Sequence, residues 1–261
     1  MAVRGESIGE IRQLLAVTPT SRLAALLAAY DEDPRAGVQS AVASGRARLE
    51  RQRLERSRLT ALYRLEAQLR RNGCQVIAGV DEVGRGALAG PLTAAAVILP
   101  SSPRIEGLND SKKLTPERRE ELAERVRCVA LGVSVAHVPA REIDAIGIGN
   151  AVRQAMILAL ENLAVQPDHI LVDGLPVRIA AQETAVVRGD GSVAAIAAAS
   201  IVAKVSRDAL MRSLADEYPE YRFDINKGYG TSEHMQAIGQ SGLSAVHRRS
   251  FGPCGGTMNL F

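Results

Sequence analysis

The sequence predicts a mixed α/β fold preceded by an all-helical N-terminal extension. From Gln75 onward, short apolar runs alternate with longer helical patterns, which is typical of a sheet flanked by helices. Residues 1–72 carry helical patterns and no strand-like run. The composition of the 261-residue chain, 46% hydrophobic and 23% charged, is that of a globular protein with room for one large domain and an appendage.

The extension begins with a helix-start signal and ends in an Arg-rich segment. Ser7 and Glu10 have the spacing of a capping box, and Thr18-Pro19 breaks the first helix. Residues 46–71 hold nine arginines and three glutamates, so the rest of the chain has 23 basic residues against 26 acidic ones. We expect one amphipathic helix over 46–71 with an Arg-rich outer side. Such a face is either simply solvated or adds non-specific affinity for nucleic acid.

The main body is expected to form a sheet covered by helices. The strand-like runs are 76–80, 92–99, 129–138, 169–172 and 184–187. The helical patterns are 21–30 in the extension and 116–126, 150–163, 193–218 and 231–238 in the body. We therefore divide the chain into a helical extension (1–72), a main α/β domain (73–252) and a flexible tail (253–261).

Several classes of protein are excluded by composition and spacing. The longest apolar run, 193–203, is far shorter than the ~18 residues of a membrane span. The three cysteines, Cys74, Cys128 and Cys254, are too scattered for a disulfide framework or a cysteine zinc site. We expect a monomeric cytoplasmic protein with no membrane segment.

Acidic residues follow three of the apolar runs. Asp81 and Glu82 follow 76–80, Asp173 follows 169–172, and Asp190 comes just before the long helical pattern. Isolated buried carboxylates are costly, so converging ones need a cation, and oxygen-only ligands suit Mg²⁺ or Mn²⁺. Two such ions can orient a water and stabilise the leaving oxygen in phosphodiester hydrolysis. Taken singly, each acid is better explained as a turn residue at the end of a strand, but three such sites in one domain favour a metal site.

A glycine-rich corner follows the first acidic pair. Gly84-Arg-Gly86-Ala-Leu-Ala89 matches a loose dinucleotide-binding pattern, but the strand-like run 92–99 stands where that motif requires a helix. We therefore expect no nucleotide cofactor. Glycines on both sides of Arg85 instead allow backbone amides and a guanidinium to approach a ligand closely.

Over residues 75–252 these motifs together resemble the ribonuclease HII family. The matching segments are Val80-Asp-Glu-Val-Gly-Arg-Gly-Ala-Leu-Ala-Gly-Pro91, Asn109-Asp-Ser-Lys-Lys-Leu114, Val172-Asp-Gly174, Gly189-Asp190, Ile196-Ala-Ala-Ala-Ser-Ile-Val-Ala-Lys-Val-Ser-Arg-Asp208, Asn226-Lys-Gly-Tyr-Gly-Thr231 and His247-Arg-Arg-Ser-Phe251. The resemblance implies an RNase H-like mixed β-sheet flanked by helices.

The resemblance also implies the reaction and its metal ligands. The implied activity is endonucleolytic cleavage on the 5′ side of ribonucleotides in RNA–DNA hybrids and of single ribonucleotides in duplex DNA, leaving 3′-hydroxyl and 5′-phosphate ends. The implied ligands of two Mg²⁺ or Mn²⁺ ions are Asp81, Glu82, Asp173 and Asp190, with Asp81 shared by both ions. The alternatives are a ribonuclease H that prefers long hybrids, or a silent module that only binds such duplexes.

Substrate contacts are implied in the same way. Gly84, Arg85 and Gly86 match the loop that senses the 2′-hydroxyl, the group that distinguishes RNA from DNA. Tyr229 matches the aromatic residue that packs on the sugar of the neighbouring deoxynucleotide, although it is also explained as an ordinary packed tyrosine. The implied phosphate contacts are Ser111, Lys112 and Lys204. Two further assignments are structural: a hydrogen-bonded His247, and a pair formed by Arg207 and Asp208.

Two regions depart from the family pattern or lie outside it. Ala87 stands where the family usually has proline; ribonuclease HIII has an acid there, so type II fits better. The last residues form an apolar tail on a Gly-rich tether. Met258, Leu260 and Phe261 resemble the peptides that dock on bacterial sliding clamps, but the leading glutamine is absent, and packing of the tail on its own domain is the alternative.

Overall fold

The computed structural model describes residues 6–255 and divides into two compact units. The first unit reaches Thr60 and the second begins at Ala61. The predicted extension 1–72 therefore spans the first unit and the start of the second. The proposed clamp-binding residues Met258, Leu260 and Phe261 lie outside the described residues.

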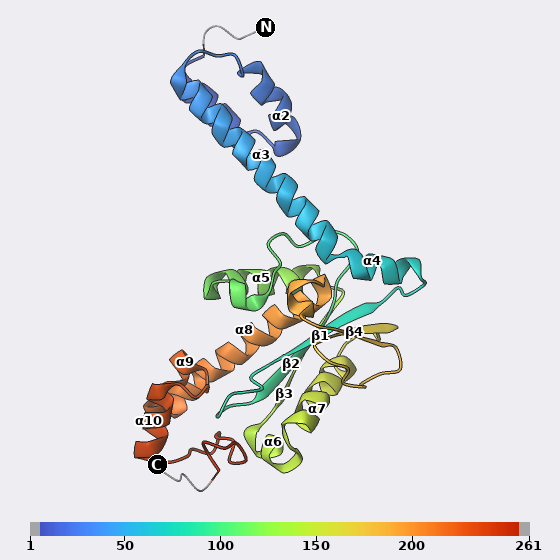
Figure 1. The fold of residues 1–261 in the computed structure, drawn as a ribbon, viewed down its shortest axis with the longest axis vertical. Coiled ribbons are helices and arrows are strands. Elements are labelled where there is room, and N and C mark those ends of the chain that lie inside the picture. The colour runs from blue at the N-terminus through green and yellow to red at the C-terminus, as the bar shows by residue number, and fades with distance from the viewer. Residues whose placement is uncertain (1–5, 256–261) are drawn as a thin grey trace. The chain divides into compact units, whose positions relative to one another are not determined.

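The first unit consists of α1 (Ile8–Val17), α2 (Thr20–Ala29) and most of α3 (Ala36–Leu62), drawn in blue in Figure 1. The predicted capping box is confirmed: the Ser7 amide donates to Glu10 Oε2 at 2.7 Å, and the Glu10 amide donates to Ser7 Oγ at 3.3 Å. The core of this unit contains Ile11, Leu15, Leu23, Leu27, Tyr30, Val38, Ala41 and Val42. Through these residues, one face of α3 packs against α1 and α2.

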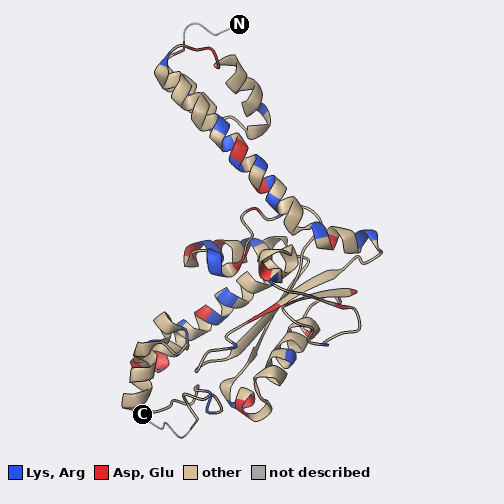
Figure 2. Ribbon diagram, viewed as in Figure 1, with Lys and Arg blue, Asp and Glu red and all other residues tan. Residues whose placement is uncertain are grey.

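The prediction of a single Arg-rich helix over 46–71 is wrong at Tyr63. The helix α3 starts ten residues earlier than predicted and ends at Leu62, and α4 (Arg64–Arg71) follows as a separate helix. Tyr63 is 3% exposed, its hydroxyl accepts a hydrogen bond from the Ile105 amide at 3.2 Å, and Arg104 lies over its ring. The helix therefore breaks where Tyr63 is buried, although no glycine or proline stands at this position to interrupt it. Figure 2 shows Lys and Arg on the C-terminal half of α3 and along α4.

The second unit is built on a five-stranded mixed sheet with the order β3-β2-β1-β4-β5. The strands are β1 (Ile77–Val83), β2 (Leu92–Ile98), β3 (Gly132–Val138), β4 (His169–Asp173) and β5 (Glu183–Val186). The pairs β1–β2 and β2–β3 are antiparallel, whereas β4 is parallel to both β1 and β5. The predicted α/β sheet is confirmed.

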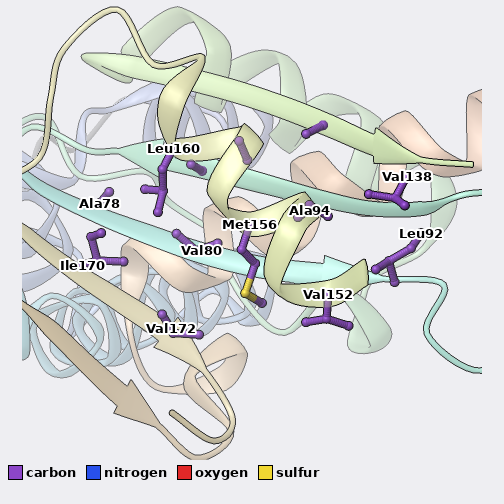
Figure 3. Close-up of a cluster of buried hydrophobic side chains, with 14 of the residues drawn as sticks. Ala78, Val80, Leu92, Ala94, Val138, Val152, Met156, Leu160, Ile170 and Val172 are labelled. Atoms are coloured by element: carbon purple, nitrogen blue, oxygen red, sulfur yellow. The ribbon is translucent and has the colours of Figure 1, made fainter. Parts of the chain in front are cut away.

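Helices cover both faces of the sheet. On one face, α6 (Ala140–Ile146) and α7 (Ile148–Glu161) pack over the strands; Val152, Met156 and Leu160 contact side chains such as Val80 and Val172 (Figure 3). On the other face lies the long α8 (Ala194–Glu217), and α5 (Pro116–Val129) packs against α8. Two short helices, α9 (Phe223–Asn226) and α10 (Ser232–Ser241), follow α8.

Close backbone packing and a cap from another helix hold α8 in place. A Cβ built on Gly79 of β1 would lie 2.1 Å from the carbonyl carbon of Ala195, so only glycine allows this approach. The side chain of Glu66 on α4 is 2% exposed and its Oε1 accepts from the Ala195 amide at 2.9 Å. An acceptor at this first turn satisfies a donor that the helix itself leaves free.

The structure moves several predicted boundaries. The strand predicted at 76–80 continues through Asp81 to Val83, and the one predicted at 129–138 begins at Gly132 because α5 runs to Val129. The helix α6 was not predicted. Within the described residues, no helix is both long enough and apolar enough to cross a membrane.

Candidate active site

Two parallel strands bring carboxylates together at one edge of the sheet. Val80 of β1 lies beside Val172 of β4, so the next residues along each strand, Asp81 and Asp173, are neighbours. Side chains alternate along a strand, and Val80 and Val172 face α7. Asp81 and Asp173 therefore face α8.

A pocket of about 250 Å³ lies at this edge of the second unit. It is lined by Asp81, Glu82, Val83, Ser111, Lys112, Arg119, Asp173, Ser200, Lys204 and Tyr229. The structure thus gathers most of the sequence-predicted site residues around one cavity. Asp190 and the Gly84–Gly86 corner are not part of its lining.

Asp190 is attached to the pocket by hydrogen bonds. It lies in a 3₁₀ turn (Gly189–Gly191) just before α8. Asp173 Oδ1 accepts from the amides of Gly189 at 2.6 Å and Asp190 at 3.3 Å, so the carboxylate that ends β4 fixes this turn. Asp190 Oδ2 in turn accepts from Lys112 Nζ at 3.0 Å.

Three acidic and three basic side chains line the pocket within the described chain, but the basic groups bond elsewhere. Lys112 pairs with Asp190, and Lys204 pairs with Asp208. Burial, and then the like charges of Glu82 and Asp173, raise the pKa of Asp81 well above its ordinary value. Burial also raises the pKa of Glu82, opposed by Arg85, whose guanidinium lies 3.9 Å from Glu82 Oε1. The pKa of Asp173 is raised by burial and then by Asp190. The ionised forms of these three neighbouring carboxyl groups are therefore unfavourable, and a bound cation would stabilise them.

The donor set fits a hard divalent cation. The acidic side chains supply only oxygen atoms, as Mg²⁺ and Mn²⁺ prefer, and no His or Cys is among the described residues that line the pocket. Among the described residues, no three Asp, Glu, His or Cys side chains are already arranged as a complete metal site. The fit therefore rests on donor chemistry and on the mutual repulsion of the neighbouring carboxylates.

The wall of the pocket opposite the strands is formed by hydroxyl and basic groups. Ser111 is 6% exposed, and its hydroxyl lies 2.9 Å from that of Ser200 on α8. Arg119 donates to the carbonyl of Ser111 at 3.0 Å and so fixes the turn that carries Lys112. Lys204, on α8, is paired with Asp208 at 2.8 Å. Ser200 and Arg119 were not predicted as site residues, because neither follows a strand or belongs to a recognisable charge pattern.

The Gly84–Gly86 corner forms a tight turn beside the pocket. Gly84 has φ +88° and is buried against Arg207, whose Nε would lie 2.2 Å from an added Cβ. Arg85 projects from the turn and is 67% exposed. The amide of Ala87 donates to the Gly84 carbonyl at 3.3 Å, a hydrogen bond that the proline usual in the family cannot make. The departure at Ala87 therefore adds a contact to the turn.

Two fully buried arginines hold this corner from behind. Arg207 donates to the carbonyls of Pro91, Lys227 and Ala89 at 2.9–3.2 Å, and Arg248 donates to those of Gly90 and Arg85 at 3.1 Å. Burial lowers the pKa of both, that of Arg248 to about 10. The predicted pairing of Arg207 with Asp208 is wrong, because Asp208 forms its ion pair with Lys204 and Arg207 donates its hydrogen bonds to backbone carbonyls.

Tyr229 lines the pocket on a turn that is bonded to the same corner. The carbonyl of Gly228 accepts from the amides of Leu88 and Ala89 at 2.8 and 3.2 Å. The guanidinium of Arg207 lies 5.5 Å from the centre of the Tyr229 ring. Arg207 therefore packs against both Tyr229 and the Gly84–Gly86 corner.

A buried histidine pair connects Tyr229 to the C-terminal segment. A carbonyl only accepts, so His234 Nδ1 donates to Tyr229 O at 2.9 Å; a backbone amide only donates, so His247 Nδ1 accepts from Ser244 at 3.0 Å. The proton between the rings therefore belongs to His247 Nε2, which donates to His234 Nε2 at 3.0 Å. Burial lowers the pKa of His247 to about 4, so both rings are neutral near pH 7. The predicted structural, hydrogen-bonded role of His247 agrees with these contacts.

Solved structures identify the class to which this fold belongs. The chain is similar to the ribonuclease H2 of Pyrococcus horikoshii OT3, with a TM-score of 0.60 and 29% identity, covering 69% of this chain and 95% of that one. It is also similar to the ribonuclease HII of Archaeoglobus fulgidus, solved in a complex with PCNA, with a TM-score of 0.59 and 26% identity, covering 68% of this chain and 95% of the other. The fold is that of the type 2 ribonucleases H, as the sequence predicted.

Sequence comparison gives the family. The family model described as ribonuclease HII matches residues 78–254, and that of the ribonuclease HII N-terminal domain matches residues 7–70. A ribonuclease HII of Desulfitobacterium hafniense is 44% identical over 248 residues, covering 95% of this chain and 94% of the relative. The chain belongs to the ribonuclease HII family. It is therefore an endoribonuclease of the ribonuclease H type, a class that acts on RNA–DNA hybrids and generally uses divalent metal ions.

Proposed function

We propose that this ribonuclease hydrolyses the phosphodiester on the 5′ side of ribonucleotides, both in RNA–DNA hybrids and at single ribonucleotides within duplex DNA. The observation that carries the proposal is the pocket itself. Its acidic floor, formed by Asp81, Glu82 and Asp173, is bordered by the basic side chains of Lys112 and Lys204. Such a site attracts cations to its floor and the phosphates of a nucleic acid to its rim.

Asp81, Glu82, Asp173 and Asp190 are the proposed metal ligands, with Asp81, the most deeply buried of the pocket carboxylates, shared by two Mg²⁺ or Mn²⁺ ions. When bound, such a pair of ions supplies an activated water and stabilises the leaving 3′-oxygen, giving 3′-hydroxyl and 5′-phosphate ends. The chain's part is to hold the carboxylates: the Gly189 and Asp190 amides orient Asp173. Lys112 is paired with Asp190, and a cation held by that carboxylate would leave the Lys112 ammonium group for a phosphate.

The neighbouring corner supplies the proposed selectivity for RNA. The backbone amides around Gly84, Arg85 and Gly86 are proposed to contact the 2′-hydroxyl, because a small polar group can approach a glycine backbone closely. Tyr229 is proposed to pack on the next sugar. Ser111, Lys112 and Lys204 are proposed to hold phosphates, which positions the strand without reading its bases.

A nicking assay on a labelled duplex with one embedded ribonucleotide tests this proposal. The reaction is run with Mg²⁺, with Mn²⁺ and with a chelator, and Asp81→Asn is assayed in parallel. The expected result is a single metal-dependent cut 5′ to the ribonucleotide that is lost in the variant. Cleavage of a continuous hybrid alone would favour a hybrid-specific enzyme, and tight binding without cleavage would contradict the catalytic assignment.

A sliding clamp is the second proposed partner. The similar ribonuclease HII of Archaeoglobus fulgidus was solved with PCNA, and the tail of this chain contains Met258, Leu260 and Phe261. A titration with a bacterial clamp tests the idea. Loss of clamp binding when Leu260 and Phe261 are changed to alanine would support this partner, and unchanged binding would contradict it.

A further inference from the structure

We propose that a groove on the first, helical unit binds the phosphate backbone of a nucleic acid duplex, as a contact separate from the active site. The proposal rests on the nuclease function proposed above. The groove lies between α1 and α3 and has a volume of about 460 Å³. Every residue that lines it belongs to the first unit.

Three arginines face this groove, and its floor is apolar. Arg12 comes from α1 and Arg48 and Arg51 from α3, while Leu15 and Ala41 contribute buried surface beneath them. Among the described residues that line the groove, none is acidic and none is aromatic. The groove therefore offers positive charge without a surface on which bases could stack.

One of the three arginines is fixed in position by the protein. The guanidinium of Arg48 donates to the carbonyls of Ala16 and Thr18, where α1 ends. Its Nε is buried and has no hydrogen-bond partner among the described residues. Arg48 therefore presents a preorganised charge beside the exposed side chains of Arg12 and Arg51.

The other two arginines differ from most of the basic residues on α3. Arg46, Arg53 and Arg58 each form an ion pair, with Asp31, Glu50 and Glu55 respectively. Within residues 6–255, Arg12 and Arg51 are exposed and have no acidic partner. Arg22 and Arg56 also lack an acidic partner within the described first unit but lie outside the groove. The groove is distinguished because three arginines without an acidic partner in the described chain line one cavity.

A phosphodiester backbone is the partner that fits these features. Clustered guanidinium groups without acidic neighbours favour phosphate, which they bind with two parallel hydrogen bonds. The absence of aromatic side chains from the described lining argues against recognition of unpaired bases, which relies on stacking. The contact is therefore independent of sequence and sensitive to salt.

Binding of the full-length protein to a fluorescent DNA duplex without ribonucleotides, measured over a range of salt concentrations, tests the proposal. Arg12→Gln and Arg51→Gln remove one groove charge each. Arg56→Gln is the matched control, since Arg56 is an exposed α3 arginine without an acidic partner in the described chain and lies outside the groove. Each groove variant should reduce the slope of log K against log salt by about 0.9 and weaken binding about eightfold at 0.1 M salt. Arg56→Gln should change neither.

The outcomes separate the groove from the active site. Equal losses of DNA affinity in Arg51→Gln and Arg56→Gln, or no loss of affinity in any variant, would refute the proposal that the groove binds DNA. Competition by polyglutamate as strong as by duplex DNA would also overturn it, because it would indicate an acidic protein partner. Cleavage of the ribonucleotide-containing duplex is measured in parallel: a wild-type protein that binds but does not cut contradicts the proposed function and leaves the groove result standing.

Discussion

Replacing Gly79 by alanine tests the packing that places the candidate site. Gly79 lies two residues before Asp81 on β1, and it contacts the backbone of α8, the helix that contributes Ser200 and Lys204 to the pocket. An added methyl group would lie 2.1 Å from Ala195 C and 2.4 Å from its carbonyl oxygen, where ordinary contacts are 3.4–4 Å. Helix and strand must therefore separate by more than ~1 Å, because backbone atoms have no rotamer by which to move aside.

The structure sets the size of the expected effect. Overpacking of a core costs about 1–3 kcal/mol, and a clash between two backbones belongs at the upper end of that range. For a protein of this size, ~3 kcal/mol lowers the melting temperature by about 6–12 °C. A displacement of ~1 Å between the acidic strand and the helix opposite it should also reduce the single-turnover cleavage rate about 10²-fold.

Thermal unfolding followed by circular dichroism, with single-turnover cleavage of a ribonucleotide-containing duplex, measures both effects. Gly149→Ala is the matched control: it lies in the first turn of α7, and its added Cβ meets no atom within 4 Å. The control should be neutral or stabilise by up to about 1 kcal/mol. If Gly79→Ala melts and cleaves like the control, the reasoning about the close approach of β1 and α8 is refuted.

Three further predictions concern charge and protonation. Asp81→Asn should lower cleavage by roughly 10³-fold or more and raise the melting temperature, because a neutral amide relieves the repulsion among the buried carboxylates. Glu66→Ala should destabilise the fold by about 1–2 kcal/mol in urea titrations, because the Ala195 amide loses its acceptor, whereas Glu66→Gln keeps an acceptor and should be nearly neutral. His247 has a pKa of about 4 when folded and 6.5 ordinarily, so the unfolded chain binds more protons between these values. The free energy of unfolding should therefore rise with pH across that window by about 3 kcal/mol, and His247→Gln should remove this part of the pH dependence.

Each of these predictions has a result that contradicts it. Wild-type cleavage by Asp81→Asn would exclude Asp81 from the metal site. Equal destabilisation by both Glu66 variants would indicate a packing role rather than a helix cap. An unchanged pH profile of stability in His247→Gln would mean that the histidine pair is not held neutral by burial.

The acidic residues of the candidate site could be predicted from the sequence because each comes directly after an apolar run or just before a helical pattern. Asp81 and Asp173 stand at the ends of apolar runs, and parallel pairing of those runs brings the two carboxylates to one edge. The buried supports follow no such rule. Arg207 was predicted only as a partner of Asp208 and Arg248 was given no role, yet both are 0% exposed and bind carbonyls far away in the sequence. The break at Tyr63 was missed for the same reason, since it coincides with a tertiary contact rather than a helix-breaking residue.

The pairing of β1 with β4 also has a consequence for the order in which the protein becomes functional during synthesis. Parallel neighbours cannot be joined by a hairpin, and about half of the second unit is translated between these two strands. The carboxylate cluster is therefore incomplete on the ribosome until the turn that carries Asp190 has emerged. A chain interrupted before that point lacks Asp190, and one interrupted before β4 lacks Asp173 as well, so a prematurely terminated product lacks at least one of the four proposed metal ligands.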